Sequence, residues 1–172
     1  MKNIVVTYFE PFGGRTTNAS KEVVSLLDGF KTKELPVSWN RVPHYIEDIL
    51  STNPDYLFLI GEAGKYKSIT IEKTAHNICD GNDNDSVNKD NEPINKGDVD
   101  VLNTRFDVSK LDYLISENAG KYLCNYSYYL ALSKAKNTKV LFVHLPYIQE
   151  SGNNSLENLA KDLLNIINKL TR

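Results

Sequence analysis

The sequence predicts an α/β fold in three layers, α/β/α, with a twisted, mainly parallel sheet covered by helices on both faces. The order of apolar and amphipathic segments predicts it. Short apolar runs ended by turn residues alternate with amphipathic segments along the 172-residue chain, and this alternation is typical of parallel strands joined by crossover helices. The sequence shows neither an internal repeat nor a linker, so we expect one domain over 1–172 with an Asn/Asp-rich excursion at about 76–103.

The first half of the chain contains three apolar strand candidates and two helices. Strands are expected at 3–7, 32–35 and 56–60, the last ended by the turn residues 61–64. A short helix is expected from Ser20, as its N-cap, to about Leu27. A second is expected at 42–50, where Ile46, Ile49 and Leu50 share one face.

The second half repeats the alternation after the excursion. Strands are expected at 68–75, 112–116 and 139–143, and helices at 123–135 and from about 155 to 170. In the last helix, Leu159, Leu163 and Ile166 recur at the spacing of one buried face. The stretch 76–103 has few apolar positions, and long loops of this kind are often functional or mobile.

Charge and cysteine content exclude several classes of function. With 20 Lys and Arg against 22 Asp and Glu, the formal charge is −2, so we expect no nucleic-acid or membrane partner. The start of the chain lacks the apolar stretch of a secretion signal, and no run is long enough to cross a bilayer. Two cysteines do not make a disulfide framework, so we expect a soluble cytoplasmic protein.

Cys124 is the first candidate for chemistry. It follows the turn-like residues 118–120 and opens the helix expected at 123–135. The positive end of a helix lowers the pKa of a thiol, and the free amides there can bind an oxyanion. A small buried side chain is the commoner role for a cysteine, and from the residue alone both interpretations stay open.

His144 and Glu72 could complete a catalytic set with Cys124. His144 ends the strand at 139–143, and the carboxyl ends of strands are where ligands bind in α/β sheets. A histidine there can take a proton from a thiol, and a carboxylate such as Glu72 can orient its ring. Taken singly, each residue has an ordinary structural interpretation, which we also prefer for His44 and His76.

Two other motifs have weaker chemical interpretations. The loop 9–14, Phe-Glu-Pro-Phe-Gly-Gly, lacks the Lys-Ser/Thr of a phosphate loop, but Phe9 and Phe12 could line a small apolar pocket. The run 80–85 fails the EF-hand pattern, because Asp85 stands where Gly is required and Asn91 where Glu is required. No spacing of Cys and His suggests zinc, so we expect no metal and no cofactor.

Taken in order, these motifs resemble the pyroglutamyl peptidase I (pyrrolidone carboxyl peptidase) family of cysteine peptidases. The matching segments are 9–14 with Asn18 and Ser20, 34–37, 61–64 with 69–72, 119–125 and 142–147. Each is moderately specific alone, and all of them in the family's order are highly specific. This ordering favours the catalytic interpretation of Cys124, His144 and Glu72.

The resemblance implies a peptidase-like domain that hydrolyses the amide bond after an N-terminal pyroglutamyl residue. It implies Cys124 as nucleophile, His144 as general base and then acid, and Glu72 as the residue that orients His144. The partners implied are N-terminally pyroglutamylated peptides, and the family is often tetrameric. The substrate ring would lie among residues at the family's pocket positions: Phe9, Phe12, Glu62, Tyr122 and Leu123.

The chain departs from the family at four places. Glu62 stands where the family usually has Gln, and Lys121 where it usually has Thr. The family carries an arginine in the loop after the glutamate segment, but here no arginine occurs between Arg41 and Arg105. The stretch before Asp112 is too short for the helix the family has there. We therefore predict that Lys121 compensates the negative charge of Glu62 and is energetically coupled to it.

Two alternatives to pyroglutamyl hydrolysis stay open at this stage. The same three residues would serve a cysteine amidase acting on a related small cyclic or acyl amide. The scaffold could also belong to a catalytically weak binding protein. Turnover of a pyroglutamyl reporter favours the peptidase, selective labelling of Cys124 without turnover favours the amidase, and no selective labelling favours the binding protein.

Overall fold

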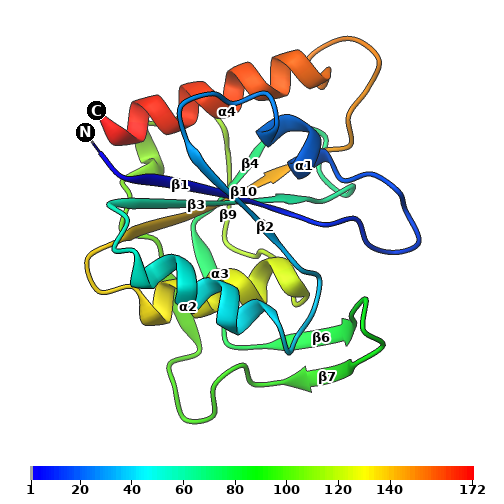
Figure 1. The fold of residues 1–172 in the computed structure, drawn as a ribbon, viewed down its shortest axis with the longest axis vertical. Coiled ribbons are helices and arrows are strands. Elements are labelled where there is room, and N and C mark those ends of the chain that lie inside the picture. The colour runs from blue at the N-terminus through cyan, green and yellow to red at the C-terminus, as the bar shows by residue number, and fades with distance from the viewer. Residues whose placement is uncertain (1) are drawn as a thin grey trace.

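A computed structural model describes residues 2–172, and its centre is a six-stranded sheet in the order β2-β1-β3-β10-β4-β9 (Figure 1). Four neighbouring strands are parallel: β2 (Lys31–Leu35), β1 (Ile4–Phe9), β3 (Tyr56–Glu62) and β10 (Lys139–Leu145). The remaining two, β4 (Thr70–Glu72) and β9 (Leu114–Ser116), run in the opposite direction. The sheet is therefore mainly parallel, with a reversed edge.

Helices cover both faces of this sheet (Figure 1). On one face lie α1 (Ala19–Val24) and α4 (Leu156–Thr171), and on the other lie α2 (Val42–Ser51) and α3 (Leu123–Lys134). Two buried apolar clusters, one on each side of the strands, hold the layers together. The predicted three-layer α/β/α class is confirmed.

The helix boundaries follow from local hydrogen bonds. The last helix begins near Ser155 as expected, with Ser155 as its cap, and Leu159, Leu163 and Ile166 are buried on one face of this helix. The cap of α1 is Asn18, which corrects the prediction of Ser20: the Asn18 side chain accepts the backbone N–H of Ser20 at 2.9 Å. The Ser20 hydroxyl instead accepts the backbone N–H of Phe9 at 3.0 Å, and it thereby joins α1 to the end of β1.

Two strand predictions were wrong in detail. Gly61 and Glu62 continue β3 rather than ending it, because their pairing with His144 and Leu145 of β10 extends the parallel ladder. The strand expected at 68–75 divides at Lys73 into β4 and β5 (Thr74–His76). The second piece leaves the main sheet and pairs with β8 (Val101–Asn103).

The Asn/Asp-rich excursion forms a hairpin beneath α2 and α3 (Figure 1), made of β6 (Cys79–Asn82) and β7 (Asn88–Glu92). The Asp83 carboxylate organises its turn by accepting the backbone N–H groups of Asp85 and Val87 at 2.9 and 2.8 Å. It also accepts the N–H of Trp39 at 2.8 Å. One role of the polar run is therefore to fold the turn and attach it to the segment before α2.

Before β9 the chain forms only a short 3-10 turn, η1 (Val108–Lys110), in the stretch that the sequence analysis expected to be too short for a longer helix. Within residues 2–172, no helix is long and apolar enough to cross a membrane.

Candidate active site

The site is built around a buried pair made by Glu72 and His144. The Nδ1 atom of His144 lies 2.7 Å from Oε1 of Glu72, and both residues are almost completely buried. They meet because β4 is antiparallel to β10, with Glu72 opposite Phe142 and Thr70 opposite His144, so Glu72 and His144 are diagonal neighbours. A proton on Nδ1 that is donated to Glu72 leaves Nε2 free to act as a base.

Two rings and a hydroxyl hold this pair in place. The ring of Phe142 lies 4.7 Å from that of His144, and the ring of Tyr66 lies 5.6 Å from it on centroids. The Tyr66 hydroxyl donates to Oε1 of Glu72 at 2.9 Å. Burial pushes the pKa of Glu72 upward, but its contacts with His144, Ser116 and Tyr66 outweigh burial and lower the pKa overall. Glu72 is therefore a carboxylate that supports a charged imidazole.

Cys124 is the second residue of α3 and lies over the end of β3. A Cβ atom added to Gly61 would come within 2.9 Å of the Cys124 sulfur and 2.7 Å of the Phe142 ring. Gly61 is paired in register with His144, and paired residues of adjacent strands share a face at a spacing of about 4.8 Å. The register thus places the thiol on the face of the sheet that carries the imidazole, in space that a glycine in β3 leaves free.

The ionisation of Cys124 differs from the expectation of a lowered pKa. Burial raises the pKa of the thiol to about 12, and the charges of Glu72 and Glu62 act in the same direction. The effect of lost hydration on the pKa of Cys124 is thus larger than the opposite effect of the helix N-terminus. Cys124 therefore rests as a thiol, and a base would have to remove its proton for it to act as a nucleophile.

Asn125 fixes the start of α3 and is a residue that the sequence analysis missed. Its side-chain oxygen accepts the backbone N–H of His76 at 2.9 Å, and its amide donates to the carbonyls of His76 and Ile78 at 2.8 and 2.9 Å. These bonds hold the first turn of α3, with the backbone amide of Cys124, against the segment after β5. A fixed N–H beside the sulfur is what an oxyanion site requires.

A small cavity opens on the sulfur of Cys124. The five pocket residues predicted from the family resemblance all line it, together with Asn18 and Val37: Phe9, Phe12, Glu62, Tyr122 and Leu123. Its free volume is only about 10 Å³, room for about one water molecule. The rings of Phe12 and Tyr122 lie 6.0 Å apart on centroids, so the cavity is nearly filled by its own walls.

Glu62 has a different cationic partner from the one predicted. Its Oε1 is paired with the guanidinium of Arg15, and its Oε2 accepts the backbone N–H of Ala19 at 2.8 Å. Lys121 instead donates to the side chain of Asn91 at 2.7 Å, on the exposed hairpin. The proposed compensation of Glu62 by Lys121 was therefore wrong, because the charge is balanced from the loop before α1.

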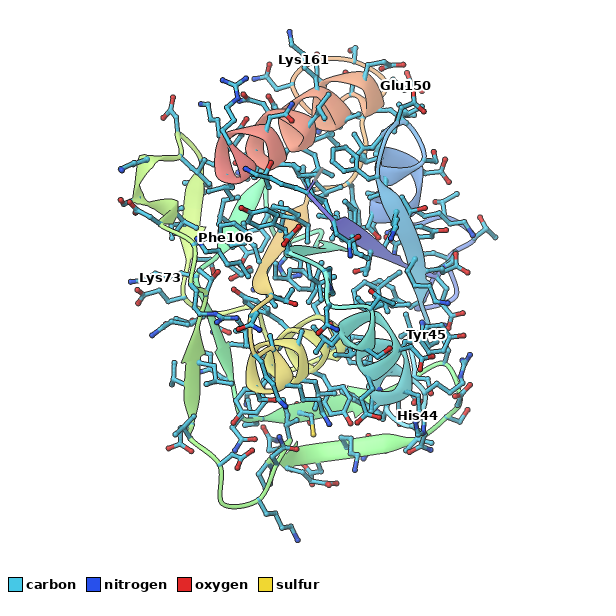
Figure 2. The ribbon with its side chains drawn as sticks, turned by 60° about the vertical axis from the view of Figure 1, so that its left-hand side comes forward. His44, Tyr45, Lys73, Phe106, Glu150 and Lys161 are labelled. Carbon is cyan, nitrogen blue, oxygen red and sulfur yellow. The ribbon has the colours of Figure 1, made fainter. Side chains whose placement is uncertain are left out.

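The remaining histidines and the second cysteine lie outside the site. His44 is exposed on α2 (Figure 2), and His76 contacts the carbonyl of Glu117 through Nε2 at 2.8 Å. Cys79 is buried in β6, where its thiol donates to the carbonyl of Glu92 at 3.4 Å. Burial raises its pKa as well.

Three further residues complete the surroundings of the site: Arg15, Tyr66 and Tyr147. The Arg15 guanidinium lies over the ring of Tyr147 at 4.5 Å, and that ring packs onto Gly64, where an added Cβ would come within 2.3 Å of it. Tyr147 directly follows Pro146 in the predicted histidine segment, which is the one hint of it in the sequence.

Comparison with known proteins agrees with this geometry. The sequence profile of the family described as pyroglutamyl peptidase matches residues 2–160. A pyrrolidone-carboxylate peptidase from Fusobacterium nucleatum is 32% identical, over 99% of this chain and 90% of the relative. The crystal structure of pyrrolidone carboxyl peptidase from Fervidobacterium islandicum is similar with a TM-score of 0.87 and 29% identity, over 99% of this chain and 98% of that one. The crystal structure of pyrrolidone carboxyl peptidase from Thermus thermophilus is similar with a TM-score of 0.85 and 29% identity, over 93% of this chain and 96% of that one.

Proposed function

The chain belongs to the pyroglutamyl peptidase family, and on that premise we propose that it hydrolyses the amide bond after an N-terminal pyroglutamyl residue with Cys124, His144 and Glu72. The activity follows from family membership. The assignment of residues is supported chiefly by the position of Cys124. Its side chain lines the small cavity and lies against Gly61, and Gly61 is paired in register with His144, which contacts Glu72.

In the first half of the reaction, the thiol proton of Cys124 passes to Nε2 of His144 as the sulfur attacks the pyroglutamyl carbonyl carbon. The oxyanion is held by the backbone N–H of Cys124. The carbon–nitrogen bond then breaks, and His144 gives the proton to the departing amine. A thioester remains on Cys124.

In the second half, His144 takes a proton from water as that water attacks the thioester carbonyl. The carbon–sulfur bond breaks, the proton returns to the thiol, and pyroglutamate leaves. Because burial holds the pKa of Cys124 at about 12, each cycle begins from a neutral thiol. Proton transfer to His144 then accompanies the formation of the carbon–sulfur bond.

The cavity fits the lactam ring chemically, although it must first open. Phe9, Phe12 and Leu123 offer apolar surface, and the Glu62 carboxylate can accept the lactam N–H. With about 10 Å³ free, we infer that the ring displaces Phe12, whose loop contains Gly13 and Gly14 at φ values of 64° and 75°. Those left-handed conformations are ones that glycine adopts readily.

We also propose that the excursion at 76–103 belongs to the same peptidase domain, because it contacts the site. The Tyr122 hydroxyl donates to the carbonyl of Asn82 at 2.6 Å, and the backbone N–H of Asp80 donates to the carbonyl of Lys121 at 2.8 Å. The hairpin thus supports one wall of the cavity.

Release of a fluorescent amine from a pyroglutamyl amide tests the proposal. The prolyl amide, which lacks the lactam carbonyl, is the matched control substrate. We expect turnover of the first only, and its loss to background in Cys124→Ala. Iodoacetamide labelling followed by peptide mapping should modify Cys124 ahead of Cys79. Labelling of Cys124 without turnover would point to a different amide, and faster labelling of Cys79 would remove Cys124 as the nucleophile.

A further inference from the structure

A second cleft begins beside the catalytic residues and has no role in the mechanism above. It has a volume of about 580 Å³, and its lining includes Gly64, Tyr66, Lys67, Tyr147, Gln149 and Asn154. Tyr66 also donates to Glu72, and Tyr147 lies three residues after His144 in the sequence. The cleft therefore starts next to the imidazole, whereas the cavity for the lactam ring opens on the sulfur of Cys124.

The walls of this cleft are tied together by hydrogen bonds. The Asn154 side-chain amide donates to the carbonyl of Lys67 at 2.9 Å, and the backbone N–H of Gln149 donates to the carbonyl of Asn154 at 2.9 Å. At the near end, the ring of Tyr147 rests on Gly64. These contacts join segment 64–68 to segment 146–154, so the cleft is preformed.

The chemistry of the reaction places the leaving peptide on this side. His144 must reach the nitrogen of the scissile bond to protonate it, so the chain after that nitrogen departs past His144 rather than past the lactam cavity. The residues beyond the imidazole are Tyr66 and Tyr147, which line the cleft. Polar side chains such as Gln149 and Asn154 along its walls can bind the backbone of an extended peptide.

Two lysines that have no acidic partner among the described residues lie at the cleft, one in its lining and one over the ring of Tyr66. Lys67 lines it, and the Lys65 ammonium lies 4.7 Å from the centroid of the Tyr66 ring. Within residues 2–172, neither lysine forms an ion pair. Arg15 lies over Tyr147, but Glu62 balances its charge.

Negative groups lie farther along or outside. Glu150 follows Gln149 at the periphery of the molecule, near the start of α4 (Figure 2). Asp112 and Asp162 line an adjoining cavity together with Lys161, and this cavity meets the cleft at Ser68, Asn153 and Asn154. The lining of the cleft among the described residues therefore includes a lysine and no carboxylate.

We propose that this cleft binds the residues that follow pyroglutamate, and that Lys67, with Lys65, selects a carboxylate at the first or second of them. The proposal rests on the proposed function and adds a preference for the leaving peptide. The carboxylate can be an acidic side chain or the C-terminus of a short peptide, since an ammonium group attracts both.

The test compares C-terminally amidated tripeptides in which Glu, Gln or Lys follows pyroglutamate and Ala follows that residue. We expect kcat/KM for the Glu peptide to exceed that for the Gln peptide by about two- to fivefold per lysine, with the Lys peptide the poorest. The preference should fall as salt is added. The dipeptide pyroglutamyl-Gln is also compared as the free acid and as the amide. A higher kcat/KM for the free acid would show that the cleft binds a C-terminal carboxylate as well as an acidic side chain.

Lys67→Gln and Lys65→Gln should each bring kcat/KM for the Glu peptide closer to that for the Gln peptide, and the ratio of the two values within each variant is the readout. Lys169→Gln, the same change at the far end of α4, is the matched control and should leave the preference intact. Equal cleavage of the three tripeptides by the wild type, or an unchanged preference in both cleft variants, overturns the cleft proposal alone. No release of pyroglutamate from any peptide overturns the proposed function and the cleft proposal with it.

Discussion

Two buried carboxylates flank Cys124, and they differ in the partner that each one has. Glu72 is paired with His144, which can gain and lose a proton, and Oε2 of Glu72 has no hydrogen-bond partner among residues 2–172. Glu62 is paired with Arg15, which stays charged, and both of its oxygens have partners. Glu72 therefore responds to a change of charge on His144, whereas Glu62 lies in a fixed and balanced arrangement.

The difference shows that burial and residue type do not determine what a carboxylate does. Both glutamates raise the pKa of Cys124 through their charge. In the proposed mechanism only Glu72 has a neighbour whose charge changes, so its stabilisation of an imidazolium would be greater in the transition state than in the resting enzyme. The charge of Glu62 contributes about equally to both states.

The largest effect should come from Glu72→Gln. An amide at this position cannot support the charged imidazole and can favour the wrong tautomer of His144, so we expect kcat to fall by about 10³-fold. The reporter assay measures it, with thermal melting as a check on folding. Glu34→Gln, an exposed carboxylate paired with Lys21, is the control and should keep normal kcat. A loss of less than tenfold in Glu72→Gln would mean that Glu72 is structural.

Gly61→Ala tests the position of the Cys124 sulfur between the two carboxylates. The new methyl group would meet the Cys124 sulfur and the Phe142 ring, and a displacement of the nucleophile by about 1 Å can cost about 10²-fold in rate. We expect kcat to fall by that factor, while alkylation of Cys124 persists at an altered rate. Gly97→Ala, in a loop where an added Cβ meets nothing within 4 Å but the φ of 84° disfavours alanine, is the control for backbone strain away from the sulfur and should keep normal kcat. Unchanged kcat in Gly61→Ala would refute the close approach of the sulfur.

Arg15→Gln should destabilise the fold more than Glu62→Gln, because it leaves a carboxylate buried without its cation. We expect a loss of about 1–2 kcal/mol in the free energy of unfolding, allowing for the partial exposure of Arg15. In the double variant the loss should be smaller than the sum, and chemical denaturation measures this coupling. The same cycle between Glu62 and Lys121 should show additive changes. Coupling to Lys121 instead of Arg15 would restore the prediction made from the sequence.

The parts of the molecule that the sequence predicted are those that local patterns specify. The apolar run at 56–60 and the spacing of Leu159, Leu163 and Ile166 depend on short-range periodicity, and they gave the layers correctly. The division of 68–75 at Lys73 was missed, because it depends on which distant strand each half pairs with: β10 and β9 for one, β8 for the other.

In the site, too, the features that depend on contacts between residues distant in the sequence were not predicted from local patterns. The order of the motifs indicated the family, and the family resemblance predicted the residues that line the cavity. The partner of Glu62 was wrong, because proximity to Cys124 along the chain does not fix where a long side chain such as Lys121 points. Arg15 reaches Glu62 across 47 residues of sequence from a glycine-containing loop. The lowered pKa expected for Cys124 failed because burial of the sulfur cannot be read from its position at a helix start.

The smallest expected effect is a change in the ionisation of Cys124 in Glu62→Gln. The charge of Glu62 disfavours the thiolate and raises the pKa of Cys124, so its removal should lower that pKa and move the midpoint of iodoacetamide alkylation to lower pH. Because Arg15 already balances Glu62, the change should be less than about one pH unit, and kcat should stay within about threefold. The rate of alkylation against pH measures the midpoint, and Glu34→Gln is again the control. A midpoint that rises in Glu62→Gln would contradict the unfavourable interaction between the Glu62 carboxylate and the thiolate. A loss of kcat as large as that in Glu72→Gln would erase the distinction between the two carboxylates, since it would require Glu62 to act on the reacting atoms.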